Sequence, residues 1–239
     1  AEKIGERAYG QKSQGQARDY IKNQFQKFGY PVKHTKFEIK GLPKVFGEQW
    51  FYNVEIILGS QASLNRESGI WVIGAHYDTA VGTPGADDNA SGVAVLIELA
   101  SLLKNKPLKR EIRLVAFSSE EPPSFLTSNM GSYQYVQKLK KEGVKVQGVI
   151  VLEMLGYYNS NPKSQLYPPF LHLFFPNRGN YIGLVSNFAS RKLLKTCKKA
   201  WKSKSDFPLE CAVLPSRMAD FALSDQLNFW AAGYPALMM

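Results

Sequence analysis

The chain has 239 residues, of which 44% are hydrophobic and 13% are aromatic, so it can bury the core of one large domain. No run approaches 18 uninterrupted apolar residues, so the sequence predicts no membrane span. The formal charge is +10, but the basic residues match no nucleic-acid-binding motif, and we expect no nucleic-acid partner.

Helix-like and strand-like patterns alternate along the chain. In chain order they predict a helix over residues 14–28, strands over 51–58 and 70–75, a helix over 91–103, a strand over 112–117, a helix over 131–142, a strand over 149–155 and a helix over 187–202. Residues 157–181 are expected to form a long ordered loop, and residues 233–239 read as a core strand. The alternation predicts an α/β fold, in which a mostly parallel central sheet carries helices on both faces in a three-layer sandwich.

Two short segments, 138–145 and 191–204, carry much of the positive charge. Their basic residues interleave with leucines, which is typical of the solvated faces of amphipathic helices, and an anionic partner is the alternative. The cysteines, Cys197 and Cys211, would pair in an extracytoplasmic protein and stay reduced in a cytosolic one, and the sequence does not choose. Because the chain begins at Ala1 without an initiator methionine, we expect a removed leader and an extracytoplasmic location, periplasmic or secreted.

A histidine and an aspartate, His76 and Asp78, come directly after the strand predicted over residues 70–75. Open α/β sheets bind ligands outside the carboxyl ends of their strands, and imidazole nitrogen is a common zinc ligand. We therefore expect His76 to bind a metal ion. Asp78 would either accept its second ring hydrogen or act through the local backbone geometry. A purely structural histidine at a strand end is the alternative.

Two acids, Asp87 and Asp88, lie in the turn before the helix predicted from residue 91. Solvated acids at a helix start suit the helix dipole, which is the simpler explanation. Asp88, twelve residues after His76, equally suits a carboxylate that bridges two metal ions.

Adjacent glutamates, Glu120 and Glu121, follow the strand predicted over 112–117. Neighbouring acids repel unless a cation lies between them, so one is expected to bind metal while the other accepts a proton from water; an acidic loop is the alternative. Glu153 lies in the apolar run 149–155, where an unpaired carboxylate is costly. A metal ion would satisfy it, and a buried Arg or Lys is the competing explanation. His34 is expected at the surface and His172 in core or loop packing.

These motifs together resemble the co-catalytic zinc exopeptidases of the bacterial leucyl aminopeptidase type, whose clan includes glutamate carboxypeptidase and glutaminyl cyclase. The resemblance covers nearly the whole chain, and its specific motifs are Gly-Ala-His76-Tyr-Asp78, Gly-Ala-Asp87-Asp88-Asn-Ala-Ser-Gly and Glu120-Glu121. It implies two zinc ions in the intact protein and a water that bridges them.

The resemblance also implies a role for each residue. His76 and Glu153 would share one zinc ion, with Asp78 orienting the imidazole. Asp88 would bridge both ions, and Glu121 would bind the second. Glu120 would be the general base that accepts a proton from the bridging water and later donates it to the leaving amine. The family usually has Asp where this chain has Glu153.

Two departures from the family pattern stand out. The family usually reads Ser-Asp-His where this chain reads Ser224-Asp225-Gln226, a change expected to alter hydrogen bonding in the pocket. The family's second histidine ligand follows the Gly-Tyr-Pro-Ala segment, and this chain stops at Met239. We therefore expect residues 1–239 to be a single zinc-exopeptidase-like domain that lacks its C-terminal segment and is weakly active or inactive.

The leading functional expectation is a zinc-dependent aminopeptidase that removes N-terminal residues from peptide substrates. Glutaminyl cyclisation on the same fold is an alternative and needs one zinc ion. Carboxypeptidase activity would need a cationic clamp, for which Arg178, Arg191 and Arg217 are available. A non-catalytic binding domain is the alternative from another class, and Gln226 and the absent histidine favour it.

Overall fold

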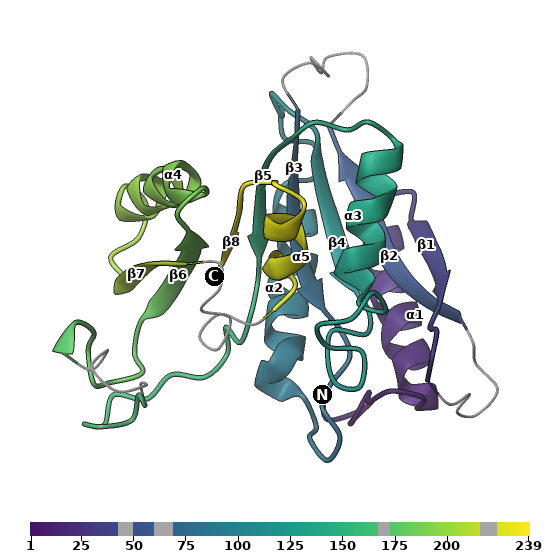
Figure 1. Ribbon diagram of the computed structural model, residues 1–239, viewed down its shortest axis with the longest axis horizontal. Helices are drawn as coiled ribbons and strands as arrows, with labels where there is room; N and C mark the ends of the chain where they lie inside the picture. Colours follow the sequence, from purple (N-terminus) through teal and green to yellow (C-terminus); the bar gives the residue numbers. More distant parts are fainter. Residues whose placement is uncertain (43–49, 60–68, 167–172, 216–223) are drawn as a thin grey trace.

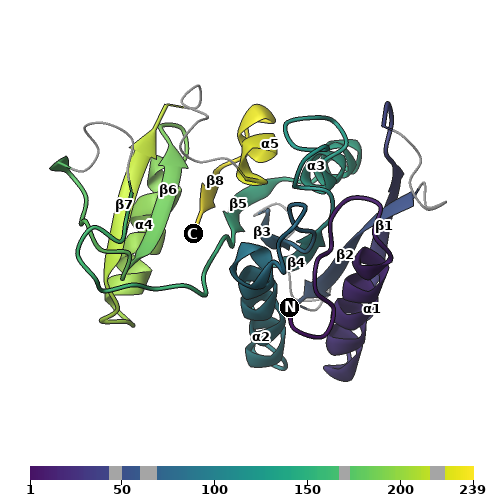
Figure 2. The same ribbon diagram turned by 90° about the horizontal axis from the view of Figure 1, so that it is seen from below.

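The computed structural model describes residues 1–42, 50–59, 69–166, 173–215 and 224–239. One eight-stranded sheet runs through these parts of the chain, with helices on both of its faces (Figures 1 and 2). The predicted α/β fold is thus confirmed. None of the helices in the described ranges has the length and hydrophobicity that crossing a membrane requires.

The strands in chain order are β1 (Lys33–Glu38), β2 (Trp50–Leu58), β3 (Ile70–His76), β4 (Ile112–Phe117), β5 (Val146–Val151), β6 (Ile182–Asn187), β7 (Leu209–Leu214) and β8 (Ala236–Met238). The helices are α1 (Lys12–Lys27), α2 (Gly92–Leu102), α3 (Gly131–Lys141), α4 (Arg191–Lys202) and α5 (Gln226–Ala231), and a short wide turn, η2, spans Ala86–Ser91.

The strands are ordered β1-β2-β4-β3-β5-β8-β6-β7 across the sheet. The central strands β4, β3, β5 and β8 are parallel to one another, and β6 is parallel to β7. The pairs β1 with β2, β2 with β4 and β6 with β8 are antiparallel. The sheet is therefore mixed with a parallel centre. Residues 233–239, read as a core strand, do supply β8 between β5 and β6.

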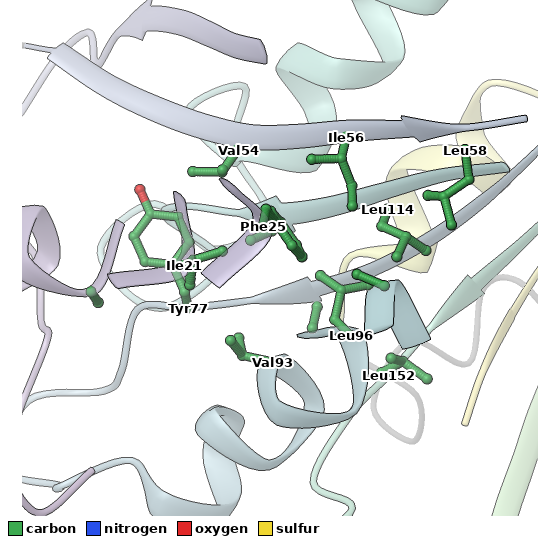
Figure 3. Close-up of a cluster of buried hydrophobic side chains, with 14 residues drawn as sticks. Ile21, Phe25, Val54, Ile56, Leu58, Tyr77, Val93, Leu96, Leu114 and Leu152 are labelled. Carbon is green, nitrogen blue, oxygen red and sulfur yellow. The ribbon is translucent and has the colours of Figure 1, made fainter. Parts of the chain in front are cut away.

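Alternate side chains of the central strands face opposite helical layers, as the pleat of a strand requires. Leu114 of β4 faces the layer of α1 and α2, and its neighbour Val115 faces α3 and α5. Figure 3 shows the first cluster, in which α1 and α2 contribute Ile21, Phe25, Val93 and Leu96, and the strands contribute Val54, Ile56, Leu58 and Leu114. Separately, α4 packs on β6 and β8 through its buried leucines. Both faces of the parallel centre are therefore buried under hydrophobic side chains.

Several predicted elements differ from the observed ones. Strand β5 ends at Val151, so Glu153 lies beyond the strand and not inside it, which corrects the prediction of a strand over 149–155. Helix α4 starts at Arg191 because Asn187 is still part of β6. Strands β1, β6 and β7 were not predicted.

The remaining expectations are met in part. Within residues 157–166 and 173–181 the structure has turns and one isolated bridge, between Asn159 and Gly179, in agreement with a long loop. His34 is exposed as expected, and His172 lies outside the described residues. Cys197 and Cys211 are both free thiols. The basic side chains of α4 face solvent, as an amphipathic helix predicts.

One lysine of the other basic segment, Lys138, belongs to a buried ion cluster. Glu55 on β2 is fully buried, and its carboxylate lies 2.5 Å from Lys138 Nζ, 3.5 Å from Arg113 Nη1 and accepts the Tyr135 hydroxyl hydrogen at 2.6 Å. Burial, with the Glu55 carboxylate next in importance, raises the pKa of Tyr135 well above its usual value, so its hydroxyl stays protonated and donates. The cluster joins α3 to β2 and β4.

We expect Glu55→Gln to lower the free energy of unfolding by about 3 kcal/mol, because it leaves Lys138 without its anion and removes one of the carboxylates beside buried Arg113, which keeps Glu111 and Glu142. Urea denaturation monitored by circular dichroism measures the loss. Glu38→Gln, on the exposed side of β1, is the matched control and should change stability by less than about 0.5 kcal/mol. Equal stabilities for the two variants would contradict the importance of the cluster.

Candidate metal centre

His76 is the last residue of β3 and lies at the sheet edge where β4 also ends. The two strands are parallel, and the N–H of Tyr77 donates to the carbonyl of Phe117 at 2.9 Å, so the residues that follow each strand emerge side by side. This register brings His76 close to Glu120, although 44 positions separate them in the sequence (120 − 76). The imidazole is 1% exposed.

Three carboxylates converge on the Nε2 atom of His76. Asp88 Oδ1 lies 3.1 Å away, Glu153 Oε1 3.4 Å and Glu120 Oε2 3.9 Å. One ligand atom each from His76, Asp88 and Glu153 all lie within 4.8 Å of one another. Carboxylates gathered in a buried site repel one another unless a cation neutralises them, and imidazole with carboxylate oxygens is a donor set that zinc accepts. The residues present therefore fit a zinc ion.

Asp78 serves mainly as an anchor for the glutamate pair. Its Oδ1 accepts the N–H of Glu120 at 3.1 Å, and its Oδ2 accepts the N–H of Glu121 at 3.0 Å. The distance from Oδ1 to His76 Nδ1 is 3.5 Å, longer than a normal hydrogen bond. Orientation of the imidazole by Asp78 therefore stays a prediction, whereas its bonds to the glutamate backbone are observed.

Glu153 is held by neutral groups. Because it follows β5, it does not need the buried Arg or Lys that was its competing explanation. Its Oε2 accepts the Ser224 hydroxyl hydrogen at 2.6 Å, and its backbone N–H donates to the carbonyl of Met239 at 2.8 Å. The other oxygen, Oε1, faces His76. Ser224 was not assigned a site role from the sequence.

Asn89 is a second residue whose role sequence reasoning missed, although it stands within the Asp87-Asp88 motif. Its buried amide donates to the carbonyl of Leu152 at 2.9 Å, and its Oδ1 accepts the N–H groups of Gly92 at 3.0 Å and Met154 at 3.3 Å. One side chain thus connects the turn that carries Asp88 to the segment that carries Glu153. A Cβ on Gly92 would lie 2.4 Å from the Asn89 oxygen, so that glycine leaves room for the contact.

Glu121 is set apart from the other three predicted ligands. Its Oε1 accepts the N–H of Ala80 at 3.0 Å. Burial, followed by the charge of Asp88, raises its pKa to about 7, so the two carboxylates are electrostatically linked. The other histidine among the described residues, His34, is exposed on β1, and no second imidazole from those residues joins the centre.

Two acids of the centre, Glu120 and Asp225, have raised pKa values. Burial raises the pKa of Glu120 well above its usual value, and the charge of His76 opposes this effect. Asp225, fully buried just before α5, has its pKa raised to about 7 by burial, again opposed by His76. Asp225 was quoted in the sequence but given no role. A carboxyl group with a raised pKa holds its proton to higher pH, as a general acid and base requires.

A family model named Peptidase family M28 matches residues 54–239, which include every acid and the histidine of this centre. The chain belongs to peptidase family M28. It is 36% identical over 230 residues to the uncharacterised protein YfbL of Escherichia coli (strain K12). The alignment covers 92% of this chain and 67% of YfbL.

The chain is also 34% identical over 152 residues to the aminopeptidase YwaD of Bacillus subtilis (strain 168), covering 63% of this chain and 30% of YwaD. It thus spans a third or less of that relative. Among solved structures, BSAP, a zinc aminopeptidase from Bacillus subtilis, superposes with a TM-score of 0.70 over 98% of this chain and 80% of BSAP at 17% identity. At that identity the likeness shows the fold alone.

The raised pKa values predict how the metal-free protein responds to pH. Glu121 and Asp225 have ordinary values of 4.5 and 3.8 and folded values of about 7, so between these limits the folded state binds more protons than the unfolded state. Stability should therefore fall as pH rises from about 4 to about 7, and zinc, which binds ionised ligands, should raise Tm more at pH 8 than at pH 5.

Thermal scans of the metal-free and zinc-loaded protein at both pH values measure this response. Asp225→Asn should flatten the slope of Tm against pH, whatever its effect on Tm at a single pH. A metal-free protein whose Tm rises from pH 5 to pH 8 would contradict the assignment.

The position of Asn89 predicts an effect on metal binding. Asn89→Ala separates the Asp88 turn from the Glu153 segment, and we expect the zinc dissociation constant to rise by about 10–100-fold, as for other residues that orient ligands. Competition with a chromogenic chelator measures the constant. Asn161→Ala, at an exposed position, should bind zinc like the unmodified protein. Zinc affinities within twofold for both variants would count against Asn89.

Proposed function

We propose that this chain carries the catalytic site of a zinc-dependent aminopeptidase. It hydrolyses the first peptide bond of its substrate, with Glu120 as general base, and so releases the N-terminal residue. One observation carries the proposal: a buried imidazole, His76, meets the carboxylates of Asp88, Glu153 and Glu120 within 3.1–3.9 Å. Membership of peptidase family M28 supports peptide-bond hydrolysis, and the aminopeptidase names of relatives support the exopeptidase form.

His76, Asp88 and Glu153 would hold the first zinc ion, and Asp88 with Glu121 would contribute to a second. When bound, zinc polarises the scissile carbonyl and lowers the pKa of water to about 7. Glu120, beside the ligands, accepts the proton of the attacking water and then donates it to the leaving amine. Its backbone, fixed by Asp78, keeps its carboxylate on the His76 side through both steps.

The charge of the centre favours a substrate with a free amino terminus. The carboxylates of Asp88, Glu120 and Glu153 surround His76, and a site rich in acids attracts a positively charged group. A carboxypeptidase would instead need an arginine clamp. Arg178 and Arg191 are both exposed and neither makes an ion pair with the centre among the described contacts, whereas Arg217 lies outside the described residues. These positions give no support to carboxypeptidase activity.

Glutaminyl cyclisation is the second candidate, and one observation favours it. Only His76, Asp88 and Glu153 form a compact ligand group in the described parts of the chain, and one zinc ion is all that cyclisation needs. Elemental analysis after zinc loading and dialysis separates the two: two retained ions favour the aminopeptidase and one favours the cyclase. Release of ammonia from a peptide with N-terminal glutamine, without release of a free amino acid, would establish the cyclase.

The role of Glu120 predicts the effect of its removal. Glu120→Gln should lower kcat for an aminoacyl p-nitroanilide by about 10²–10⁴-fold, because the proton acceptor is lost, while the zinc content stays unchanged. Glu38→Gln is the control and should retain full activity. An N-acetylated substrate should be resistant in every case. A Glu120→Gln protein with a kcat within threefold of that of the unmodified protein would contradict the assignment of Glu120 as general base.

A further inference from the structure

Arg7 is a buried arginine in the segment before α1, far from the centre in the sequence. It is 3% exposed. Its guanidinium donates to the carbonyls of Tyr77 at 2.7 Å, Pro84 at 3.0 Å and Gly85 at 2.8 Å, and also to that of Gly5 at 2.7 Å. The described hydrogen bonds of this cation therefore end on backbone oxygen atoms. The N-terminal segment lies beside the start of α2 (Figure 2).

Three of the four carbonyls that Arg7 binds lie at the two ends of one loop. This loop, residues 77–85, leads from His76 at the end of β3 to the turn that carries Asp88. The backbone N–H of Arg7 adds a bond to the Thr79 hydroxyl at 2.9 Å. Arginine suits such a position because its planar fork can reach several acceptors at fixed angles, which a lysine ammonium cannot.

Gly85 adapts the loop to the guanidinium. Its φ is +57°, and a Cβ at this position would lie 2.5 Å from Arg7 Nη2 and 2.7 Å from the Asp88 carbonyl. The glycine therefore lets the arginine and the Asp88 backbone approach each other. Any shift of the guanidinium would be passed directly to the residues that position Asp88.

Arg7 also places a fixed positive charge beside the acidic centre. Burial lowers the pKa of Arg7, and the carboxylates of Asp78 and Asp88 act against this effect. An arginine keeps its charge at every physiological pH. The charge thus offsets part of the repulsion among the acids.

We propose that Arg7 is a positioning residue of the metal centre, which clamps the loop 77–85 and so sets the position of Asp88 relative to His76. The zinc part of this inference rests on the proposed function. Arg7 lies outside residues 54–239, so the family match does not cover it.

The test compares five variants in two measurements. Arg7→Met removes the fork and the charge, and Arg7→Lys restores the charge alone. Gly85→Ala adds a methyl group that meets the Thr79 side chain, the guanidinium and the Asp88 carbonyl, and so disturbs the clamped loop from its other side. Glu55→Gln lowers stability at a distance from the centre, and Arg191→Met removes an exposed arginine as a control. Zinc dissociation constants come from chelator competition, and hydrogen exchange of the metal-free proteins reports the opening of residues 77–90.

We expect Arg7→Met and Gly85→Ala to raise the zinc dissociation constant at least about tenfold and Arg7→Lys to raise it less. Exchange over residues 77–90 should rise in Arg7→Met and not in Glu55→Gln. Unchanged zinc affinity and unchanged exchange in a folded Arg7→Met protein would overturn the inference. If the unmodified protein binds no zinc, the proposed function fails, and the exchange data still decide whether Arg7 holds the loop.

Discussion

The carboxylate of Asp78 accepts the backbone N–H groups of two consecutive residues, Glu120 and Glu121, and the geometry of the site depends on this contact. It joins the residues that follow β3 to those that follow β4. A buried carboxylate needs donors, and the two N–H groups supply them without a basic side chain. The same bonds fix the backbone that carries Glu120. The buried Asp78 carboxylate therefore determines the direction in which the Glu120 side chain projects.

The opposite side of the centre is held by neutral side chains. Asn89 both donates and accepts, and so connects the Asp88 turn to the segment after β5, while Ser224 binds one oxygen of Glu153. Because these supports are neutral, Asp88 and Glu153 make no salt bridge to a lysine or arginine among the described residues, and their oxygens stay available to a metal cation. The positive charge of Arg7 is delivered to backbone carbonyls, which leaves the ligand oxygens free of it.

The parts of the fold that the sequence predicted are those where burial is continuous. Strand β4 was predicted residue for residue because both of its faces are covered. Strand β1 has one buried side chain, Phe37, so its pattern carries little signal. The apolar run around β5 continues past Val151 because Leu152 is also buried, and hydrophobicity does not report where strand pairing stops.

The same distinction applies to the candidate site. His76, Asp88 and Glu153 were predicted from residue type and motif, and the structure brings them together. The supports could not be predicted, since their partners are remote in the chain: Asn89 binds a carbonyl 63 positions away and Ser224 a carboxylate 71 positions away. Only the packed fold determines such pairs.

The place of β8 in the sheet bears on how the protein folds. In the strand order β8 stands between β5 and β6, although β6, β7 and α4 all precede it in the sequence. The segment from β6 to β7 can pair around α4, and β1 to β5 can pair with one another without β8, although Val54 already pairs with Ala116 and Ile73 with Ile150. The two halves become one sheet only when a three-residue strand inserts between them, and contacts this distant in sequence are slow to form. We therefore view β8 as the closing element of a two-part assembly.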